Sequence, residues 1–318
     1  MLTFSELLQA HNRIRPVVFR TPLVRSSHWP ELYFKMECWQ KTGSFKVRGA
    51  LNAVFVNSIS SSAPVVAASA GNHGLGVAFA AQYVGRRAMI FVPESVSPAK
   101  LSAIQAMGVQ VAVAGKDYDA SEQEAMQFAG ENGYPFVHAF AAPEVIAGQG
   151  TVGLEIAQQL PEVKTVIVPV GGGGLISGVA KALKTLLPKV SILGVQSEAS
   201  PAMVAALKAG RVVETAVLPS LADGLAGRFV HDTTLAMTQS YVDDVVLVSE
   251  ETIAHAMYLL MERHKWVVEG SAAVGLAAWL EGKVPGPGPI AIVLTGSNVA
   301  TETVHALLKK HQKGGNTQ

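Results

Sequence analysis

The stretch VPVGGGGLISGVA, residues 168–180, passes from a β-branched run through four consecutive glycines into a helical pattern. Backbone N–H groups that no side chain hinders, together with the positive end of a following helix, form a binding site for phosphate. A flexible loop is the alternative, but glycines placed between a strand and a helix favour the phosphate site. This stretch has neither the dinucleotide fingerprint G-x-G-x-x-G nor a Walker lysine, so we expect a phosphate that does not belong to a nucleotide.

Further β-branched runs alternate with helical patterns on both sides of this stretch. They are PVVAAS (64–69), RAMIFVP (87–93), VQVAVAG (109–115), PFVHAF (135–140), SILGVQS (191–197) and AIVLTG (291–296). Helix signals stand between them; Ser97, Pro98 and Gly108, for example, mark the start and end of one helix. The alternation predicts an α/β fold with two open, mostly parallel sheets that helices cover on both faces.

Two structural units follow from this order. We expect a small domain over residues 47–144 and a large domain formed by residues 1–46 and 145–318, which carries the glycine stretch. In α/β proteins, ligands bind at the carboxyl ends of the strands and in clefts between units. We therefore expect the functional pocket between these two domains.

Composition excludes several classes of protein. Hydrophobic residues make up 49% of the 318 residues and charged residues 15%, which indicates a core-rich globular chain and not a disordered one. With 25 basic and 24 acidic residues, the chain has no positive field for nucleic acid. Pro169 and the glycines interrupt the most apolar stretch, so no membrane helix is expected. The N-terminus has a Thr3–Glu6 capping box in place of a signal peptide, and Cys38 is the only cysteine; both predict a cytoplasmic protein.

Lys46 lies in the stretch QKTGSFKVRGA, residues 40–50, between Phe45 and Val47. Burial in an apolar pocket lowers the pKa of a lysine and makes its amine nucleophilic. Such an amine forms a Schiff base with a carbonyl cofactor. The alternative interpretation is a surface lysine at the start of a helix. Further segments of the chain are needed to distinguish the two interpretations.

The segment SAGNHGLG, residues 69–76, also joins a strand to a helix. The Asn72 amide can bond a ring hydroxyl, and the N–H groups from Ser69 through Ala70, Gly71 and Asn72 to His73 can hold a substrate carboxylate. His73 itself is either a structural histidine or a catalytic one. We predict a substrate contact at each of these five residues.

Two more segments supply polar groups. Thr295 in LTGSN, residues 294–298, places a hydroxyl at the end of a strand. Gly224 lies in LADGLAG, residues 221–227, and Glu269 lies in KWVVEGSAAVG, residues 265–275. We count Gly224 and Glu269 among the cofactor contacts, although Glu269 can equally be a helix-capping carboxylate. A reactive lysine, a phosphate site and a hydroxyl partner for a ring nitrogen together fit pyridoxal 5′-phosphate.

The order of these segments resembles one enzyme family over nearly the whole chain. KTGSFKVRGA, SAGNHGLGVA, VPVGGGGLISG, GVQSE, LADGLAG and LTGSNVA occur as in fold-type II pyridoxal-phosphate enzymes of the threonine/serine dehydratase and serine racemase family. The resemblance implies a tryptophan-synthase-β-like fold whose large domain binds the cofactor. It also implies a homo-oligomer, either a dimer or a tetramer. We expect no regulatory domain after the catalytic part, and in this respect the chain resembles the short, catabolic dehydratases.

The resemblance also implies roles for individual residues. Lys46 corresponds to the Schiff-base lysine, Phe45 packs on the ring, Asn72 contacts the 3′ oxygen, Thr295 faces the pyridine nitrogen, and Gly171, Gly172, Gly173, Gly174 and Leu175 hold the phosphate.

Four positions depart from the family pattern. Racemases of this family carry a serine where this chain has Ala70, and alanine cannot deliver a proton. Gln196 and Ala202 replace the acidic residues of the divalent-cation site found in many members, so we expect no metal. Ser297 replaces a glycine of the usual S-G-G-N, while Thr295 keeps the hydroxyl.

We therefore predict a lyase of amino-acid catabolism that converts a small β-hydroxy amino acid, L-threonine or L-serine, to a 2-oxo acid and ammonia by α,β-elimination. A serine racemase and a dehydratase for hydroxyaspartate or phenylserine are the alternatives within the family. A non-catalytic protein that binds pyridoxal phosphate is an alternative from another class. A nucleotide-binding domain is disfavoured by the missing fingerprint.

Overall fold

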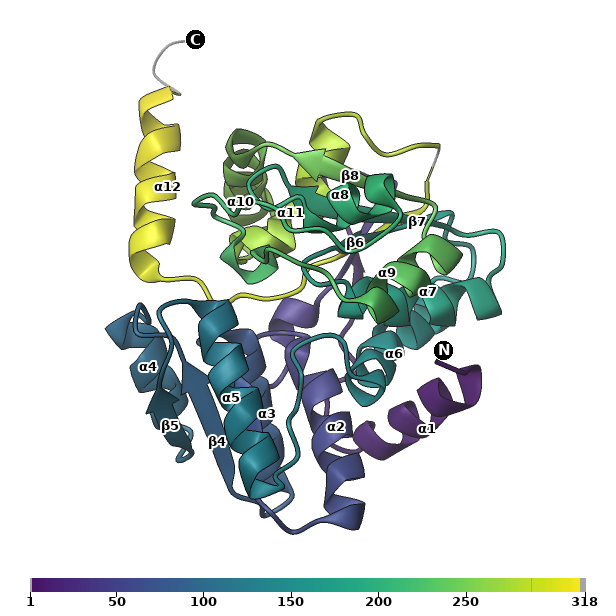
Figure 1. Ribbon diagram of the computed structural model, residues 1–318. Coiled ribbons are helices and arrows are strands. Elements are labelled where there is room, and N and C mark those ends of the chain that lie inside the picture. Colours follow the sequence, from purple (N-terminus) through teal and green to yellow (C-terminus); the bar gives the residue numbers. More distant parts are fainter. Residues whose placement is uncertain (1, 287, 315–318) are drawn as a thin grey trace.

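The computed structural model describes residues 2–286 and 288–314 and contains two sheets in two halves of the molecule (Figure 1). The larger sheet has the order β1 (Leu23–Arg25), β2 (Leu32–Lys35), β9 (Ile290–Val293), β6 (Thr165–Pro169), β7 (Ser191–Ser197) and β8 (Asp244–Val248). The smaller sheet has the order β3 (Val65–Ala68), β4 (Ala88–Val92) and β5 (Gln110–Val113). Only β1 pairs antiparallel, with β2, and the other pairs are parallel. The mostly parallel α/β prediction is confirmed.

Helices connect the strands in the expected alternation. They are α1 (Phe4–Ile14), α2 (Lys46–Ser60), α3 (Asn72–Tyr83), α4 (Pro98–Gln105), α5 (Tyr118–Asn132), α6 (Pro143–Gln159), α7 (Gly174–Leu186), α8 (Ala202–Ala209), α9 (Asp232–Tyr241), α10 (Glu250–His264), α11 (Gly270–Leu280) and α12 (Thr301–Gly314), with the short 3₁₀ turns η1 (Glu37–Trp39) and η2 (Asp223–Leu225). The Thr3–Glu6 capping box forms at α1, and Ser97 caps α4 as predicted.

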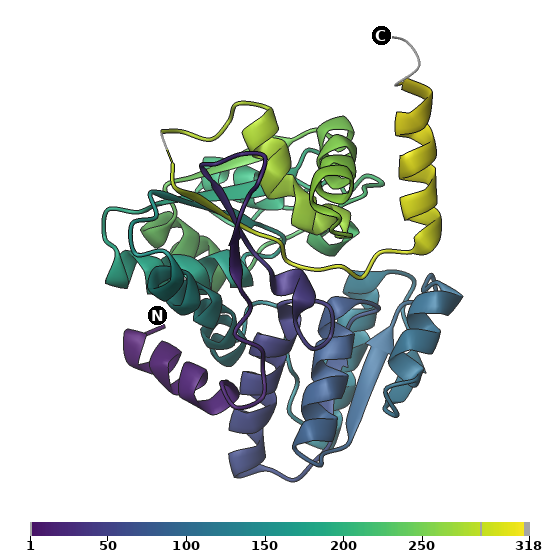
Figure 2. The ribbon, with the colours of Figure 1, turned by 180° about the vertical axis from the view of Figure 1, so that it is seen from behind.

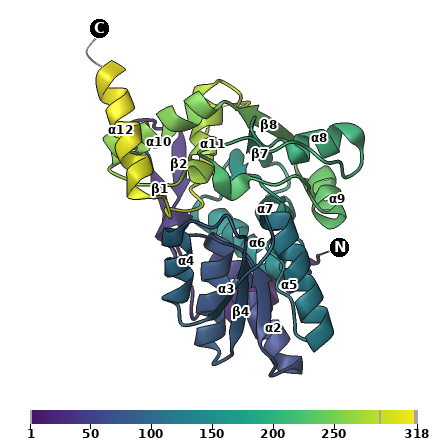
Figure 3. The same ribbon diagram turned by 60° about the vertical axis from the view of Figure 1, so that its left-hand side comes forward.

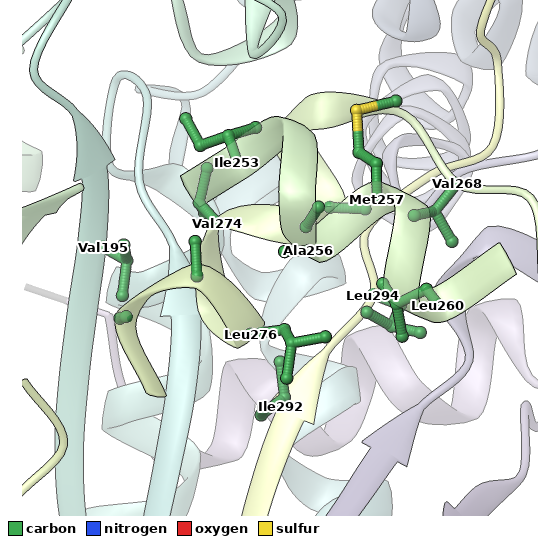
Figure 4. Close-up of a cluster of buried hydrophobic side chains, with 14 of the residues drawn as sticks. Val195, Ile253, Ala256, Met257, Leu260, Val268, Val274, Leu276, Ile292 and Leu294 are labelled. Atoms are coloured by element: carbon green, nitrogen blue, oxygen red, sulfur yellow. The ribbon is translucent and has the colours of Figure 1, made fainter. Parts of the chain in front are cut away.

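Alternate residues of the large sheet pack against different helices. Ile167 of β6 and Ile292 of β9 face α10 and α11, and Figure 4 shows Ile292 beside Leu276 of α11. Val166 and Val168 of β6 join the cluster on the opposite face, which α6, α7 and α8 cover. This period of two places apolar side chains on both faces, as a buried parallel sheet requires.

The small sheet is covered in the same way. One face packs against α2, α3 and α4, while α5 covers the other, and Figure 3 shows α3 and α5 on either side of β4. The strand β5 lies at the edge and is only partly buried. The run PFVHAF forms no strand; only Phe136 makes an isolated bridge, to Val66.

The first 45 residues contribute to the large sheet, because the β1–β2 hairpin extends it beside β9 (Figure 2). The strands β1, β2 and β8 were not predicted from the sequence. The division into domains 47–144 and 1–46 plus 145–318 stays a prediction. No helix in the described part of the chain is long and apolar enough to cross a membrane.

Candidate active site

A cavity of about 400 Å³ lies where the carboxyl ends of β3, β6 and β9 converge. Its walls include all the residues predicted to bind cofactor or substrate: Phe45, Lys46, Ser69, Ala70, Gly71, Asn72, His73, Gly171, Gly172, Gly173, Gly174, Leu175, Gly224, Glu269 and Thr295. These residues are distributed over more than 250 positions of the chain, so only the fold brings them together. The roles of the individual residues remain predictions.

Lys46 is the first residue of α2, and the preceding loop is fastened to the end of β9. The Phe45 N–H donates to the Thr295 carbonyl at 3.0 Å, and Ser44 forms a bridge with Gly296. The Lys46 Nζ donates to the Ala139 carbonyl at 3.0 Å. Burial lowers the pKa of Lys46 to about 8, and the carboxylates of Glu269 and Glu122 oppose this only in part. The amine is therefore nucleophilic near neutral pH.

The glycine loop leads from β6 into α7 and has the features of a phosphate site. The first helical hydrogen bond of α7 runs from the Ser177 N–H to the Gly173 carbonyl at 3.0 Å, so the preceding N–H groups of the first turn have no helical partner. Gly173 has a φ of 93°, a conformation that side chains disfavour. A Cβ at Gly172 would lie 2.5 Å from the Phe140 ring. A substitution at Gly172 therefore disturbs packing as well as the phosphate site.

Two hydroxyls in the cavity wall are buried and have no hydrogen-bond partner within the described residues. Thr295 Oγ1 lies at the end of β9, where the sequence predicted a ring-nitrogen partner. Ser271 Oγ lies in the first turn of α11 and was not predicted. An unsatisfied buried hydroxyl costs about 1–3 kcal/mol, and a polar ligand in the cavity removes that cost. The arrangement fits a cofactor with a ring nitrogen and a phosphate.

Glu269 occupies the N-cap position of α11, but its side chain makes no capping bond. Instead both of its oxygens accept from Asn72 Nδ2, at 2.9 and 3.0 Å. The Asn72 Oδ1 in turn accepts from Asn298 Nδ2 at 2.6 Å. Burial raises the pKa of Glu269 to about 7, although the bond from Asn72 acts in the opposite direction. Of the two interpretations left open by the sequence, these contacts favour the site residue.

His73 is almost completely buried and its contacts favour the structural interpretation. Its Nε2 donates to the Val137 carbonyl at 2.8 Å, which joins α3 to the segment after α5. Burial and the nearby Lys46 charge lower the pKa of His73 to about 3, so the ring is neutral at physiological pH.

Ion pairs at the rim of the cavity connect the two halves of the molecule. Lys100 of α4 pairs with Asp223 of η2 at 2.8 Å. Arg228 pairs with Asp119, and with Asp117 at 3.2 Å, both near the start of α5. The partners are more than 100 residues apart in the chain, and no local sequence signal could have indicated these contacts.

Gln196 has a structural role at the position where related enzymes carry a metal ligand. Its Oε1 accepts from the N–H groups of Met203 and Val204, both at 3.0 Å, and so satisfies the start of α8. Within residues 2–286 and 288–314, no three His, Cys, Asp or Glu side chains gather as a metal site would require. The absence of a metal stays a prediction.

Comparison with known proteins adds independent findings. The family described as "Pyridoxal-phosphate dependent enzyme" matches residues 14–296. An L-threonine ammonia-lyase of Thermotoga maritima is 43% identical over 316 residues, which cover 98% of this chain and 79% of that protein. The structure of maize serine racemase has a TM-score of 0.88 at 34% identity and covers 99% of both chains. The processed form of threonine deaminase isoform 2 from Solanum lycopersicum has a TM-score of 0.87 at 32% identity and covers 96% of this chain and 94% of its own.

Proposed function

Because this chain belongs to the family of pyridoxal-phosphate dependent enzymes, we propose that it removes water from L-threonine or L-serine and releases a 2-oxo acid and ammonia. The membership confirms the family, the fold type and the cofactor that the sequence predicted. One observation carries the proposal: the Lys46 amine, with a pKa of about 8, shares its cavity with the glycine loop and the unpaired Thr295 hydroxyl.

Lys46 is the residue that binds the cofactor and then accepts the α-proton. When bound, pyridoxal phosphate supplies an electron sink for the negative charge that develops at the α-carbon. The N–H groups of Gly174 and Leu175 at the start of α7 hold its phosphate. The Lys46 amine is partly neutral near pH 7.5 and takes the proton as the Cα–H bond breaks.

The substrate carboxylate binds at the start of α3. The first helical hydrogen bond of α3 runs from the Leu75 N–H to the Gly71 carbonyl at 3.2 Å. The N–H groups of Asn72 and His73 therefore have no helical partners. No side chain caps this helix, and residues 69–73 line the cavity. A carboxylate is the anion that fits this position.

Elimination follows when the Cβ–O bond breaks and the hydroxyl leaves with a proton as water. One proton is removed at Cα and one is delivered to the hydroxyl, so the step needs no net acid. The released enamine then adds water and loses ammonia to give the 2-oxo acid.

Thr295 favours elimination over reactions that need a long-lived carbanion. A neutral hydroxyl does not protonate a ring nitrogen as a carboxylic acid would, so the negative charge is held less firmly. Rapid loss of a β-substituent suits this weaker electron sink. The buried Thr295 Oγ1, which has no hydrogen-bond partner within the described residues, supports this role.

Ala70 disfavours a racemase, even though the similar structures include serine racemases. Racemisation returns a proton to the α-carbon from the face opposite Lys46. Ala70 lines the cavity, and its methyl group has no exchangeable proton. Water alone, without an oriented hydroxyl, is a poor substitute.

A substrate panel tests the proposal. The cofactor-loaded protein is mixed with L-threonine, L-serine, hydroxyaspartate or phenylserine, and 2-oxo acid release is measured. We expect 2-oxobutyrate or pyruvate from the first two. Turnover of hydroxyaspartate or phenylserine alone would support the corresponding alternative, and no turnover of any of the four would support a non-catalytic binding protein.

We also propose a homo-oligomer, a dimer or tetramer, in the cytoplasm. Phe19, Trp39 and Val267 each expose nearly half of their surface, and Trp39 packs edge-on against Trp266 beside Val267. Exposed aromatic and aliphatic side chains of this size are typical of contact surfaces. Light scattering on the purified protein measures the oligomeric state, and a monomer at micromolar concentration would contradict this part.

A further inference from the structure

A short turn, residues 138–141, is built around the imidazole of His138. The His138 Nδ1 accepts from the N–H groups of Phe140 and Ala141, both at 3.1 Å. Asparagine and aspartate side chains form the same local bonds to backbone N–H groups two and three residues ahead. Burial, together with the charges of His231 and Lys46, lowers the pKa of His138 to about 4, so the ring is neutral and Nδ1 keeps its lone pair.

The turn contacts both halves of the cofactor site. Its Ala139 carbonyl accepts from Lys46 Nζ at 3.0 Å. Its Phe140 ring lies against Gly172, and the Phe140 backbone lies against Gly174, so closely that neither glycine has room for a Cβ. The turn therefore touches the catalytic amine on one side and the phosphate loop on the other.

The other nitrogen of the imidazole faces a carboxylate. With Nδ1 as acceptor, Nε2 carries the proton, and it lies 3.8 Å from Glu122 Oε1. Glu122 also accepts from the Tyr118 hydroxyl at 2.8 Å, one turn earlier on α5. Glu122 and Tyr118 line the cavity, and at 3.8 Å the Glu122 carboxylate favours a proton on Nε2 without accepting a hydrogen bond from it.

We propose that His138 is a positioning residue, which shapes the turn that sets the Lys46 amine and the glycine loop at their working separation. The positioning of the Lys46 amine for catalysis rests on the proposed function. The positioning of the glycine loop requires only that the protein binds the cofactor. His138 itself does not exchange a proton in the reaction. Its loss therefore acts through Ala139 and Phe140 and affects both catalysis and cofactor affinity.

Three substitutions separate positioning from simple loss of a buried ring. H138N places an amide oxygen where it can accept the same two N–H bonds. H138Q keeps the polarity but carries its oxygen one bond farther from the backbone, and H138L has no acceptor. The matched control is H305L, which removes an exposed histidine of α12 that is not part of the cavity lining.

Two readouts are measured on each variant. The cofactor-free protein is titrated with pyridoxal phosphate, and the visible band that borohydride bleaches gives the Kd. The kcat and KM for L-threonine are then measured with saturating cofactor. We expect H138L and H138Q to raise the Kd roughly tenfold and to lower kcat on the order of 10²-fold. H138N and H305L should stay within about threefold of the unmodified protein in both.

The asparagine and glutamine pair keeps the test decisive even if H138L does not fold. Folding is followed by the thermal midpoint of the far-UV circular dichroism signal. An unchanged Kd and kcat in a folded H138Q would overturn the proposal, and so would a folded H138N as impaired as H138Q. If neither the unmodified protein nor any variant turns over L-threonine or L-serine, the proposed function fails, while the Kd series still decides the positioning of the phosphate loop.

Discussion

Two buried basic side chains of the same helix, α2, have different hydrogen-bond partners. Arg48 lies two residues after Lys46 on α2, and its guanidinium bonds to Glu37 and Glu155 at 2.7–2.9 Å. Lys35 completes this paired cluster through Glu155 at 2.6 Å. Lys46, in contrast, has only the Ala139 carbonyl as a hydrogen-bond partner within the described residues.

The pKa values follow from this difference. Burial alone would lower the pKa of Arg48, but the adjacent Glu37 and Glu155 carboxylates outweigh it and raise the pKa. Among residues 2–286 and 288–314 no carboxylate bonds to Lys46, so burial prevails and lowers its pKa to about 8. The charges of the paired cluster bind one another and stabilise the fold, whereas the Lys46 amine in the cavity remains available to a ligand. Four changes test this contrast, from the largest expected effect to the smallest.

Replacing Lys46 by methionine should abolish catalysis and leave the fold intact. The variant lacks both the nucleophile and the proton acceptor, so 2-oxo acid release should fall by about 10⁴-fold or more. Because the amine has no carboxylate partner, we expect the free energy of unfolding to change by less than about 1 kcal/mol. Coupled assays and urea unfolding measure the two quantities. A large loss of stability would mean that Lys46 also belongs to the structural charges.

Replacing Glu155 by glutamine should destabilise the fold and leave cofactor binding almost unchanged. It leaves Arg48 and Lys35 buried with only Glu37 as a charged partner, and breaking a buried pair costs about 3–5 kcal/mol. Urea unfolding of the cofactor-free protein gives this value directly. The Kd for pyridoxal phosphate should change little in the fraction that remains folded. A loss below about 1 kcal/mol would show that the cluster is not the paired structural unit described here.

Glu269 should make stability depend on pH. Its carboxyl keeps a proton up to about pH 7 in the folded protein, compared with an ordinary value of 4.5. The folded state therefore binds more protons than the unfolded state between these values, and this contribution to stability is lost as pH rises through about 7. The loss is on the order of 3 kcal/mol. Unfolding of the cofactor-free protein from pH 4 to 8 should show this fall, and E269Q should remove it. Parallel curves for the two proteins would show that the Glu269 carboxyl does not cause the pH dependence of stability.

Ala70 should have the smallest effect on total turnover but a clear effect on the product. The unmodified protein should form pyruvate from L-serine much faster than D-serine, because Ala70, at the position where the family resemblance implies a serine that returns the proton, has no exchangeable proton. A70S should raise the share of D-serine while keeping most of the dehydratase rate. Chiral chromatography of the reaction mixture measures the ratio. D-serine formation by the unmodified protein at a rate equal to or above that of pyruvate would favour a racemase.

Local motifs could be predicted because each one is contiguous in the chain. The glycine loop and the Asn72 segment each join a strand to a helix, the Lys46 stretch leads from η1 into α2, and all three reach the same cavity. The strand and helix alternation gave the α/β class for the same reason, since period and helix caps are local properties.

Contacts between distant segments could not be predicted in this way. Arg228 meets Asp119 only after both halves have folded, and Ser271 becomes an unpaired hydroxyl only through the packing around it. The run PFVHAF has the composition of a strand, but the His138 imidazole takes two N–H groups and turns the chain instead. A local bond from a side chain to the backbone thus overrides the strand preference of this run.

The identity of the lysine that binds the cofactor tests the central claim most directly. The purified, cofactor-loaded protein is reduced with borohydride, digested and analysed by mass spectrometry. The contrast between paired and unpaired charges predicts the pyridoxyl mass on the peptide that contains Lys46, together with bleaching of the visible band. A pyridoxyl mass on Lys41, Lys35 or any other lysine, with Lys46 unmodified, would contradict it.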